Sequence, residues 1–110
     1  MFMSLVKLHS ITEKRRELQQ TLKLLASLIR SEAGCHESGL YQQVGDETVF
    51  LLISTWQSRV ALDDHLQSSR FSVLLGTRCL LRRPLEMEIH KVETFTGFRT
   101  PNLEQSTTDP

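Results

Sequence analysis

The chain has 110 residues and a mass of 12.6 kDa, with 39% hydrophobic and 24% charged residues. This size and composition are typical of one globular domain. Thirteen Lys and Arg balance thirteen Asp and Glu, so no net positive field attracts nucleic acid. The longest apolar run, Val49 to Ile53, is far shorter than the roughly 20 residues that cross a bilayer. We therefore expect a cytoplasmic protein with no nucleic-acid or membrane partner.

The first third of the chain predicts a strand followed by a helix. Residues Phe2 to His9 are rich in β-compatible side chains and apolar on both sides. Ser10 to Glu13 matches a capping box, so a helix is expected to begin there. Its apolar stripe, at steps of four, three and four, consists of Leu18, Leu22, Leu25 and Ile29, widened by Leu24 and Leu28. Gly34 can end the helix in the left-handed conformation.

The middle of the chain predicts a β-hairpin. Gly39 to Val44 forms a short strand, Gly45 to Glu47 the turn, and Thr48 to Trp56 the second strand. Both faces of this second strand are apolar over most of its length. Helices can cover one face of the sheet, so something else must cover the other.

The remaining elements are two short helices and a last strand. Ser58 can cap a helix from Arg59 to about Leu66, and Ser68-Ser69 can start another, which Gly76 interrupts. The last strand spans Leu85 to Val92. Residues 1–93 are therefore expected to form the domain. Residues 94–110 are rich in Thr, Pro, Asn, Gln and Ser and predict a tail that is flexible or packed on a partner subunit.

The order of these elements predicts an α+β fold. Strand, helix, strand, strand, helices, strand is the ferredoxin-like split βαβ arrangement, an antiparallel sheet with helices on one face. A symmetric homodimer with facing sheets is the simplest way to cover the apolar face that the helices leave open, because symmetric pairs are the commonest oligomers.

The sequence carries no P-loop, Gly-rich dinucleotide turn, HExxH, GxSxG or EF-hand pattern, so we expect no cofactor. Three isolated side chains are candidates for a site. Trp56 is either a core aromatic or a pocket wall whose indole N–H donates to a ligand oxygen. His65 is either structural or a base that takes a proton from a weak acid such as a phenol. Tyr41 either packs across strands or donates a hydrogen bond in the same cavity.

Other polar residues favour structural roles. Glu86, Glu88 and His90 alternate along one strand and resemble a metal site, but ligands at steps of two are splayed about 7 Å apart. Lys7 or Lys91 can pair with them instead, so we expect no metal. We expect His9 and His36 at the surface or in loops. The basic residues Arg78, Arg82 and Arg83 favour a solvated helix end. Cys35 and Cys79 form no CxxC pair or Cys/His cluster and predict reduced thiols.

Several strings of residues resemble the antibiotic biosynthesis monooxygenase (ABM) domain over about residues 2–93. They are Glu32-Ala-Gly-Cys35, Leu40-Tyr41, Phe50 to Ser58, Leu62 to Ser68, and Phe71. The most specific features are the Trp56-x-Ser58 and His65-x-x-Ser68-x-x-Phe71 spacings. The resemblance implies a dimeric α/β-barrel of two ferredoxin-like protomers, each with a pocket between its sheet and helices.

The resemblance also implies chemistry. Similar proteins include cofactor-independent monooxygenases of phenols or quinols, haem-degrading enzymes and an isomerase. In the first group an electron-rich phenolate can itself reduce dioxygen. By this resemblance, His65 is expected to be the base and Trp56 a hydrogen-bond donor. Tyr41 and Phe71 are expected to contact a small aromatic substrate. Enzymes of this phenol-oxidising type are expected to use a set of Asn, Trp, Arg and Tyr residues. Of these, only the Trp has a convincing match in this chain, at Trp56. A haem-degrading relative should carry Trp in place of His65 and His in place of Leu75, which disfavours haem as a substrate. The alternative is a small-molecule-binding or stress-response module without turnover.

Overall fold

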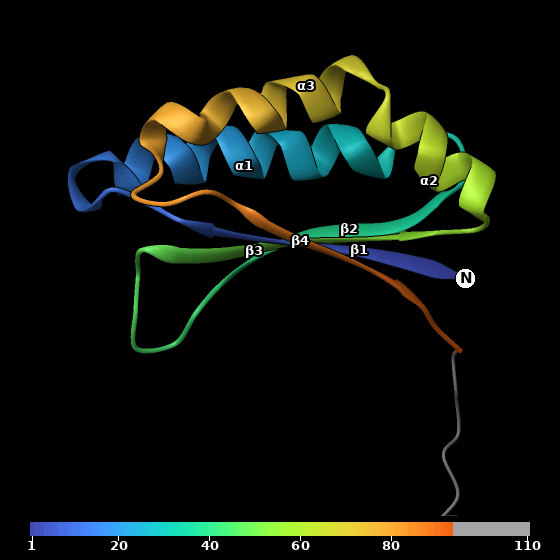
Figure 1. The fold of residues 1–110 in the computed structure, drawn as a ribbon, viewed down its shortest axis with the longest axis horizontal. Helices are drawn as coiled ribbons and strands as arrows, with labels where there is room; N and C mark the ends of the chain where they lie inside the picture. Colours follow the sequence, from blue (N-terminus) through green and yellow to red (C-terminus); the bar gives the residue numbers. More distant parts are fainter. Residues whose placement is uncertain (94–110) are drawn as a thin grey trace, which may run out of the picture.

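The computed structural model describes residues 1–93 and contains one four-stranded antiparallel sheet in the order β2-β3-β1-β4. All helices in this part of the chain cover one face of the sheet (Figure 1). The strands are β1 (Phe2–His9), β2 (Cys35–Gln42), β3 (Val49–Trp56) and β4 (Glu86–Lys91). The helices are α1 (Arg15–Arg30), α2 (Arg59–Leu66) and α3 (Ser69–Gly76), with 3-10 turns η1 (Thr12–Lys14) and η2 (Thr77–Leu80).

This architecture confirms the predicted α+β class and the ferredoxin-like topology. No helix within residues 1–93 is long and apolar enough to cross a membrane. The predicted polar tail, residues 94–110, lies outside the described residues.

The core lies between the sheet and the helices. On the sheet side, Phe50, Leu52 and Trp56 of β3 are each at most 3% exposed. The predicted stripe of α1 packs against them, because Leu18, Leu22, Leu25 and Ile29 are all buried. The prediction that Leu24 and Leu28 widen this stripe is wrong. They are 61% and 38% exposed, since their positions on the helix turn them away from the sheet.

The predicted capping box at Ser10 is also wrong. The Ser10 hydroxyl donates to the carbonyl of Ile11, and the backbone N–H of Ser10 donates to Thr48 O. Ser10 is held there in an isolated bridge with Leu81, so its side chain does not cap the first helical turn. Residues 12–14 form η1 instead, and α1 begins at Arg15.

The caps of the two short helices agree with prediction. The Ser58 hydroxyl accepts from the N–H of Ala61 at the start of α2, and the Ser68 hydroxyl accepts from the N–H of Phe71 at the start of α3. Gly34 has the predicted positive φ, 81°. A Cβ at Gly34 would also lie 2.5 Å from the Cβ of Ala61, so the turn between α1 and β2 requires glycine for two reasons.

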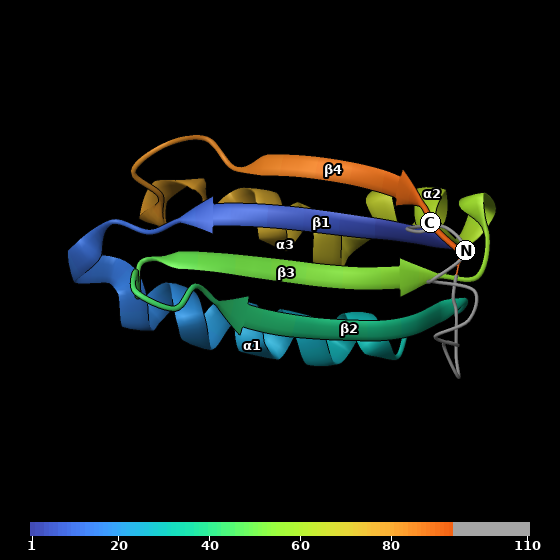
Figure 2. The same cartoon turned by 90° about the horizontal axis from the view of Figure 1, so that it is seen from below.

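No element of residues 1–93 covers the face of the sheet opposite the helices (Figure 2). In the centre it carries Met3 and Leu5 of β1 and Leu51 and Ile53 of β3, all partly exposed. Towards β4 it becomes polar, because Glu86, Glu88 and His90 follow one another on this side. We call this surface the open face.

Candidate functional site

The structure brings together three of the four residues predicted for the site. Trp56 ends β3, and its fully buried indole stacks on the ring of His65, with centroids 4.6 Å apart and an interplanar angle of 25°. Phe71 of α3 meets the same imidazole edge-on, at 5.6 Å and 72°. We call Trp56, His65 and Phe71 the aromatic cluster. It fixes the plane of the His65 ring, which is only 3% exposed.

Glu32 completes this cluster from the turn after α1. Its carboxylate oxygens lie 3.1 and 3.2 Å from Nδ1 of His65, and its side chain is 11% exposed. An ionised carboxylate can only accept hydrogen bonds, so it holds the proton of the neutral imidazole on Nδ1. The lone pair is then on Nε2, and the hydrogen bonds of His65 among residues 1–93 are made at Nδ1. This is the arrangement of a general base oriented by an acid.

The indole N–H of Trp56 is already engaged. It donates to Oγ of Ser54 at 2.9 Å, so the expectation that it donates to a ligand oxygen does not match this geometry. Ser54 is the middle of a row of three buried serines on the helix-facing side of the sheet, with Ser4 on β1 and Ser38 on β2 as its register partners. Within residues 1–93, Ser38 Oγ is the one buried side-chain polar atom without a hydrogen-bond partner.

Tyr41 is not part of the aromatic cluster. Its side chain is 55% exposed and lies on the open face of the sheet, opposite Leu51 in the register of β2 and β3. The prediction that Tyr41 shares a cavity with Trp56 and His65 is therefore wrong. A single sequence shows which residues of a strand alternate, but not which set the helices cover.

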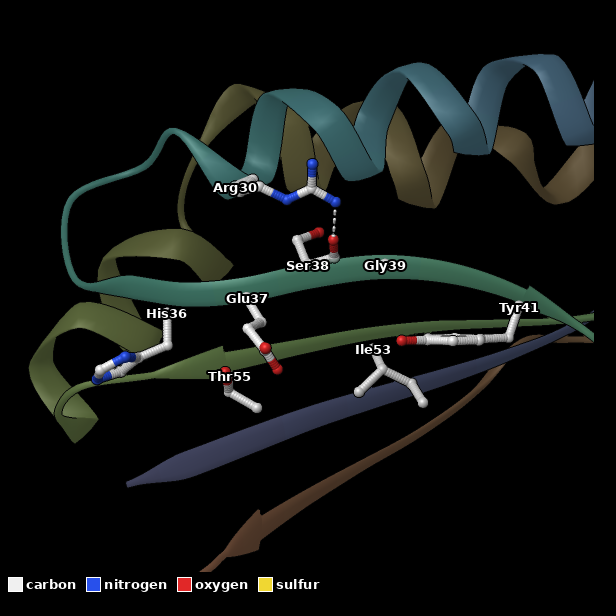
Figure 3. Close-up of a pocket in the computed structure, with 8 residues that line it drawn as sticks. All are labelled: Arg30, His36, Glu37, Ser38, Gly39, Tyr41, Ile53 and Thr55. Atoms are coloured by element: carbon white, nitrogen blue, oxygen red, sulfur yellow. Dashed lines mark hydrogen bonds between the residues drawn. The ribbon is translucent and has the colours of Figure 1, made fainter. Parts of the chain in front are cut away.

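Tyr41 instead lines a hollow of about 430 Å³ at the free edge of β2, the edge strand of the sheet (Figure 3). Arg30 reaches from α1 over Ser38, and an N–H of its guanidinium donates to the carbonyl of Ser38. The remaining walls come from β2 and β3 and consist of His36, Glu37, Gly39, Ile53 and Thr55. We call this hollow the β2 pocket. Trp56 and His65 do not line it.

Comparison with known proteins identifies the family. A family model described as "Antibiotic biosynthesis monooxygenase" matches residues 1–74, about two thirds of the chain. The chain belongs to this family. The Bacillus subtilis (strain 168) protein named "Putative monooxygenase YcnE" is 28% identical to it over 76 residues, which cover 68% of this chain and 80% of YcnE.

Solved structures with the family's fold superpose closely. A protein from Deinococcus radiodurans described as a "putative antibiotic biosynthesis monooxygenase" has a TM-score of 0.81 and 20% identity, covering 90% of this chain and 99% of its own. Rv0793 from Mycobacterium tuberculosis has a TM-score of 0.78 and 23% identity, covering 87% and 98%. At these identities the likeness shows the fold alone.

Sequence reasoning missed Glu32 as a functional residue. Glu32 stood in the first string that resembled the ABM family, Glu32 to Cys35, but it is 33 residues from His65 and no local pattern links the two. Its carboxylate also affects Cys35. Burial, followed by the charge of Glu32, raises the pKa of the Cys35 thiol above its ordinary value. Cys35 is therefore a poor nucleophile in this family member.

Two further expectations change in the structure. His9 is not at the surface: it is 3% exposed, and an Nη of Arg83 lies 2.8 Å from its Nε2. Arg82 and Arg83 follow η2 and are exposed, as expected for a solvated helix end, although both guanidinium groups also lie near this imidazole. At the strand that resembled a metal site, His90 Nε2 lies 2.7 Å from Glu88. Glu88 therefore pairs along its own strand rather than with the lysines expected as partners.

Proposed function

We propose that this chain is a monooxygenase that oxidises a small phenolic or quinol substrate with dioxygen, and that His65 is the base that removes the substrate's proton. The observation that carries the proposal is the Glu32–His65 pair, whose geometry leaves Nε2 free to accept a proton. The family and the name of its Bacillus relative support an oxygenase. The sequence also lacks cofactor-binding motifs, which suits a substrate that reduces dioxygen itself.

The proposed reaction needs no external reductant. His65 takes the phenolic proton, and the resulting phenolate transfers an electron to dioxygen. The two radicals then combine in a carbon–oxygen bond, and the peroxide breaks down with loss of water. For hydroquinone the products are hydroxyquinone and water. One oxygen atom is added to the ring carbon, and the other leaves as water with one ring hydrogen and one hydroxyl hydrogen of the hydroquinone. The substrate supplies all the electrons.

Each member of the site has a role in this proposal. Glu32 stabilises the imidazolium that forms when His65 is protonated. Trp56 positions the imidazole by stacking on it and is itself held by Ser54. Phe71 supplies an apolar contact for the substrate ring. Because His65 is 3% exposed, the substrate must displace part of the cover formed by α2 and α3, which are only eight residues each.

The active form in this proposal is a homodimer with facing sheets. The support is the open face, where Met3, Leu5, Leu51 and Ile53 form a partly exposed apolar centre that no helix within residues 1–93 covers. A contiguous apolar patch of this kind is typical of a protein interface.

A specific observation favours a second candidate, a small-molecule-binding module without turnover. The β2 pocket contains neither His65 nor Trp56. A ligand seated there would not contact His65, and in this alternative Tyr41 is a binding residue.

Oxygen uptake with a panel of hydroquinones and anthrones distinguishes the two candidates. The wild type should consume oxygen faster than the buffer blank, and His65→Ala should lose about 100-fold or more of this rate. Trp56→Phe should retain part of it, because a smaller ring still stacks on the imidazole. His90→Ala is the matched control, since that imidazole is exposed on β4. Binding of panel members without oxygen uptake would establish the second candidate.

A further inference from the structure

We infer that a groove on the outer side of the helices binds a medium-chain fatty acid, with the carboxylate of the ligand at Arg70. The groove lies between α1 and α3 and has a volume of about 400 Å³, which is in the range of small-molecule sites. Its walls include Leu24, Leu25 and Leu28 of α1 and Ser69, Arg70 and Val73 of α3. We call it the helix groove. The aromatic cluster does not line it, so the inference does not rest on the proposed oxidation.

The walls of the helix groove are aliphatic and open to solvent. Leu24, Leu28 and Val73 are 61%, 38% and 52% exposed, although a leucine or valine on a helix is usually buried. Single exposed apolar side chains are common, but a group of them around one hollow is typical of a binding surface. Leu25, which is 3% exposed, belongs to the buried stripe of α1 and closes the floor of the groove.

The shape of the helix groove suits a linear chain. Along α1 its walls extend from Thr21 to Leu28, two helical turns or about 10 Å. On the other side, Val73 lies one helical turn after Ser69 on α3. An extended aliphatic chain can lie along these two helices and contact Leu24, Leu28 and Val73 together, whereas a compact polar ligand would leave them exposed.

A positive charge lies at one end of the helix groove. Helices α1 and α3 run in opposite directions (Figure 1), so Arg70 at the start of α3 lies towards the Leu28 end of the groove rather than the Thr21 end. Arg70 is partly buried and forms no ion pair with a carboxylate of residues 1–93. An arginine can pack its methylene groups on an apolar surface while its guanidinium pairs with a carboxylate. An apolar chain with an anionic head therefore matches both parts of the groove.

Neither the proposed dimer nor a second symmetric contact explains the helix groove. In the facing-sheet dimer the partner lies against the open face, and the helices lie on the other side of the sheet (Figure 1). In a two-fold contact at the groove itself, the same patch would meet its own copy. The one charged side chain that lines this patch is Arg70, so both guanidinium groups would lack an acidic partner. A separate anionic ligand supplies that partner.

Titration of the full chain with decanoate, kept below its micelle concentration and followed by ¹H–¹⁵N NMR, tests the inference. Binding should saturate, with the largest shifts at the amides of Leu24, Leu28 and Val73. Arg70→Gln should weaken binding about fivefold, because it removes a partly exposed ion pair. Its matched control is Arg78→Gln, an exposed arginine outside the groove, which should bind as the wild type does.

A second pair of variants tests the apolar wall. Leu24→Ser should weaken binding about threefold or more, because it removes apolar contact with the chain of the ligand. Val60→Ser is the matched control, since Val60 is 69% exposed on α2 and does not line the groove. Circular dichroism should show that all four variants fold. Equal affinity of Leu24→Ser and Val60→Ser, or of Arg70→Gln and Arg78→Gln, would overturn the inference.

Changing the ligand separates the chain from the head group. Octanoate should bind about fourfold or more weakly than decanoate, because it buries two fewer methylene groups. Decylamine, with the same chain and the opposite charge, should bind more weakly than decanoate to the wild type, and Arg70→Gln should narrow this difference. The inference is overturned if decanoate does not saturate or if decylamine binds as tightly.

Two other occupants of the helix groove give distinct results. If Leu24→Ser lowers the sedimentation coefficient of the protein without any ligand, a second copy occupies the groove. If the protein binds vesicles of phosphatidylglycerol but not decanoate, the occupant is a membrane surface. Either result contradicts the fatty-acid site. Because no step needs oxygen, a failure of the proposed oxidation leaves these results readable.

Discussion

Removing the carboxylate of Glu32 should destabilise the protein through His65. The Nδ1 atom of His65 lies 3.1 and 3.2 Å from the two Glu32 oxygens, and the imidazole is 97% buried. In Glu32→Ala the Nδ1–H loses its acceptor in a site that water reaches poorly. A buried hydrogen bond to a charged group contributes about 1.5–3 kcal/mol, so we expect the free energy of unfolding to fall by about 2 kcal/mol.

Urea denaturation at pH 7.5, followed by tryptophan fluorescence, measures this loss, because the single Trp56 stacks on the same imidazole. Glu17→Ala is the matched control. Glu17 is 61% exposed, and its pair with Lys14 spans 3.9 Å, so its loss should cost about 0.5 kcal/mol or less. Glu32→Gln should recover most of the stability, because the amide oxygen can still accept from Nδ1. Equal stability of Glu32→Ala and Glu17→Ala would refute the pairing of Glu32 with His65.

Three further perturbations test other parts of the structure. Burial, followed by the Arg83 charge, lowers the pKa of His9 below its ordinary 6.5. The unfolded chain then takes up this proton first, so stability should fall as the pH drops below about 6.5, and less steeply in His9→Gln. Urea midpoints at pH 7.5 and 5.5 measure this, and identical slopes would contradict it. Ser38→Ala should unfold at an equal or higher temperature than the wild type, because it removes an unpartnered buried hydroxyl; a clear fall in the thermal midpoint would mean that the hydroxyl has a partner. Leu51→Glu on the open face should turn a dimer into a monomer in sedimentation, and a wild type that sediments as a monomer would contradict the facing-sheet dimer.

Local patterns in the sequence were sufficient for most of the fold. The stripe from Leu18 to Ile29 and the caps at Ser58 and Ser68 depend on residues within one or two turns, so their spacing alone predicts them. The predicted cap at Ser10 failed because residues distant in sequence hold Ser10 instead. The backbone N–H of Ser10 donates to the carbonyl of Thr48, and Ser10 forms an isolated β-bridge with Leu81. Neither contact can be predicted from the residues around Ser10.

The candidate site was less predictable because its partners are distant in sequence. The residues of the aromatic cluster could be named because their spacing resembles that of the ABM family. Glu32 could not, because it contacts His65 across 33 residues of sequence. His9 is enclosed by Arg83, 74 residues away. The choice between the two roles left open for Tyr41 could not be made from the sequence, because alternation along β2 defines two sets of residues without saying which set the helices cover.

Oxidation in labelled dioxygen tests the proposed function most directly. The full chain is incubated with hydroquinone under oxygen-18 gas, and the product is examined by mass spectrometry, with His65→Ala as the control for spontaneous oxidation. If His65, oriented by Glu32, is the base, the wild type should form hydroxyquinone that carries one labelled oxygen atom. His65→Ala should not form this product above background. An unlabelled quinone, or equal labelling with both proteins, would contradict a monooxygenase that uses His65 as its base.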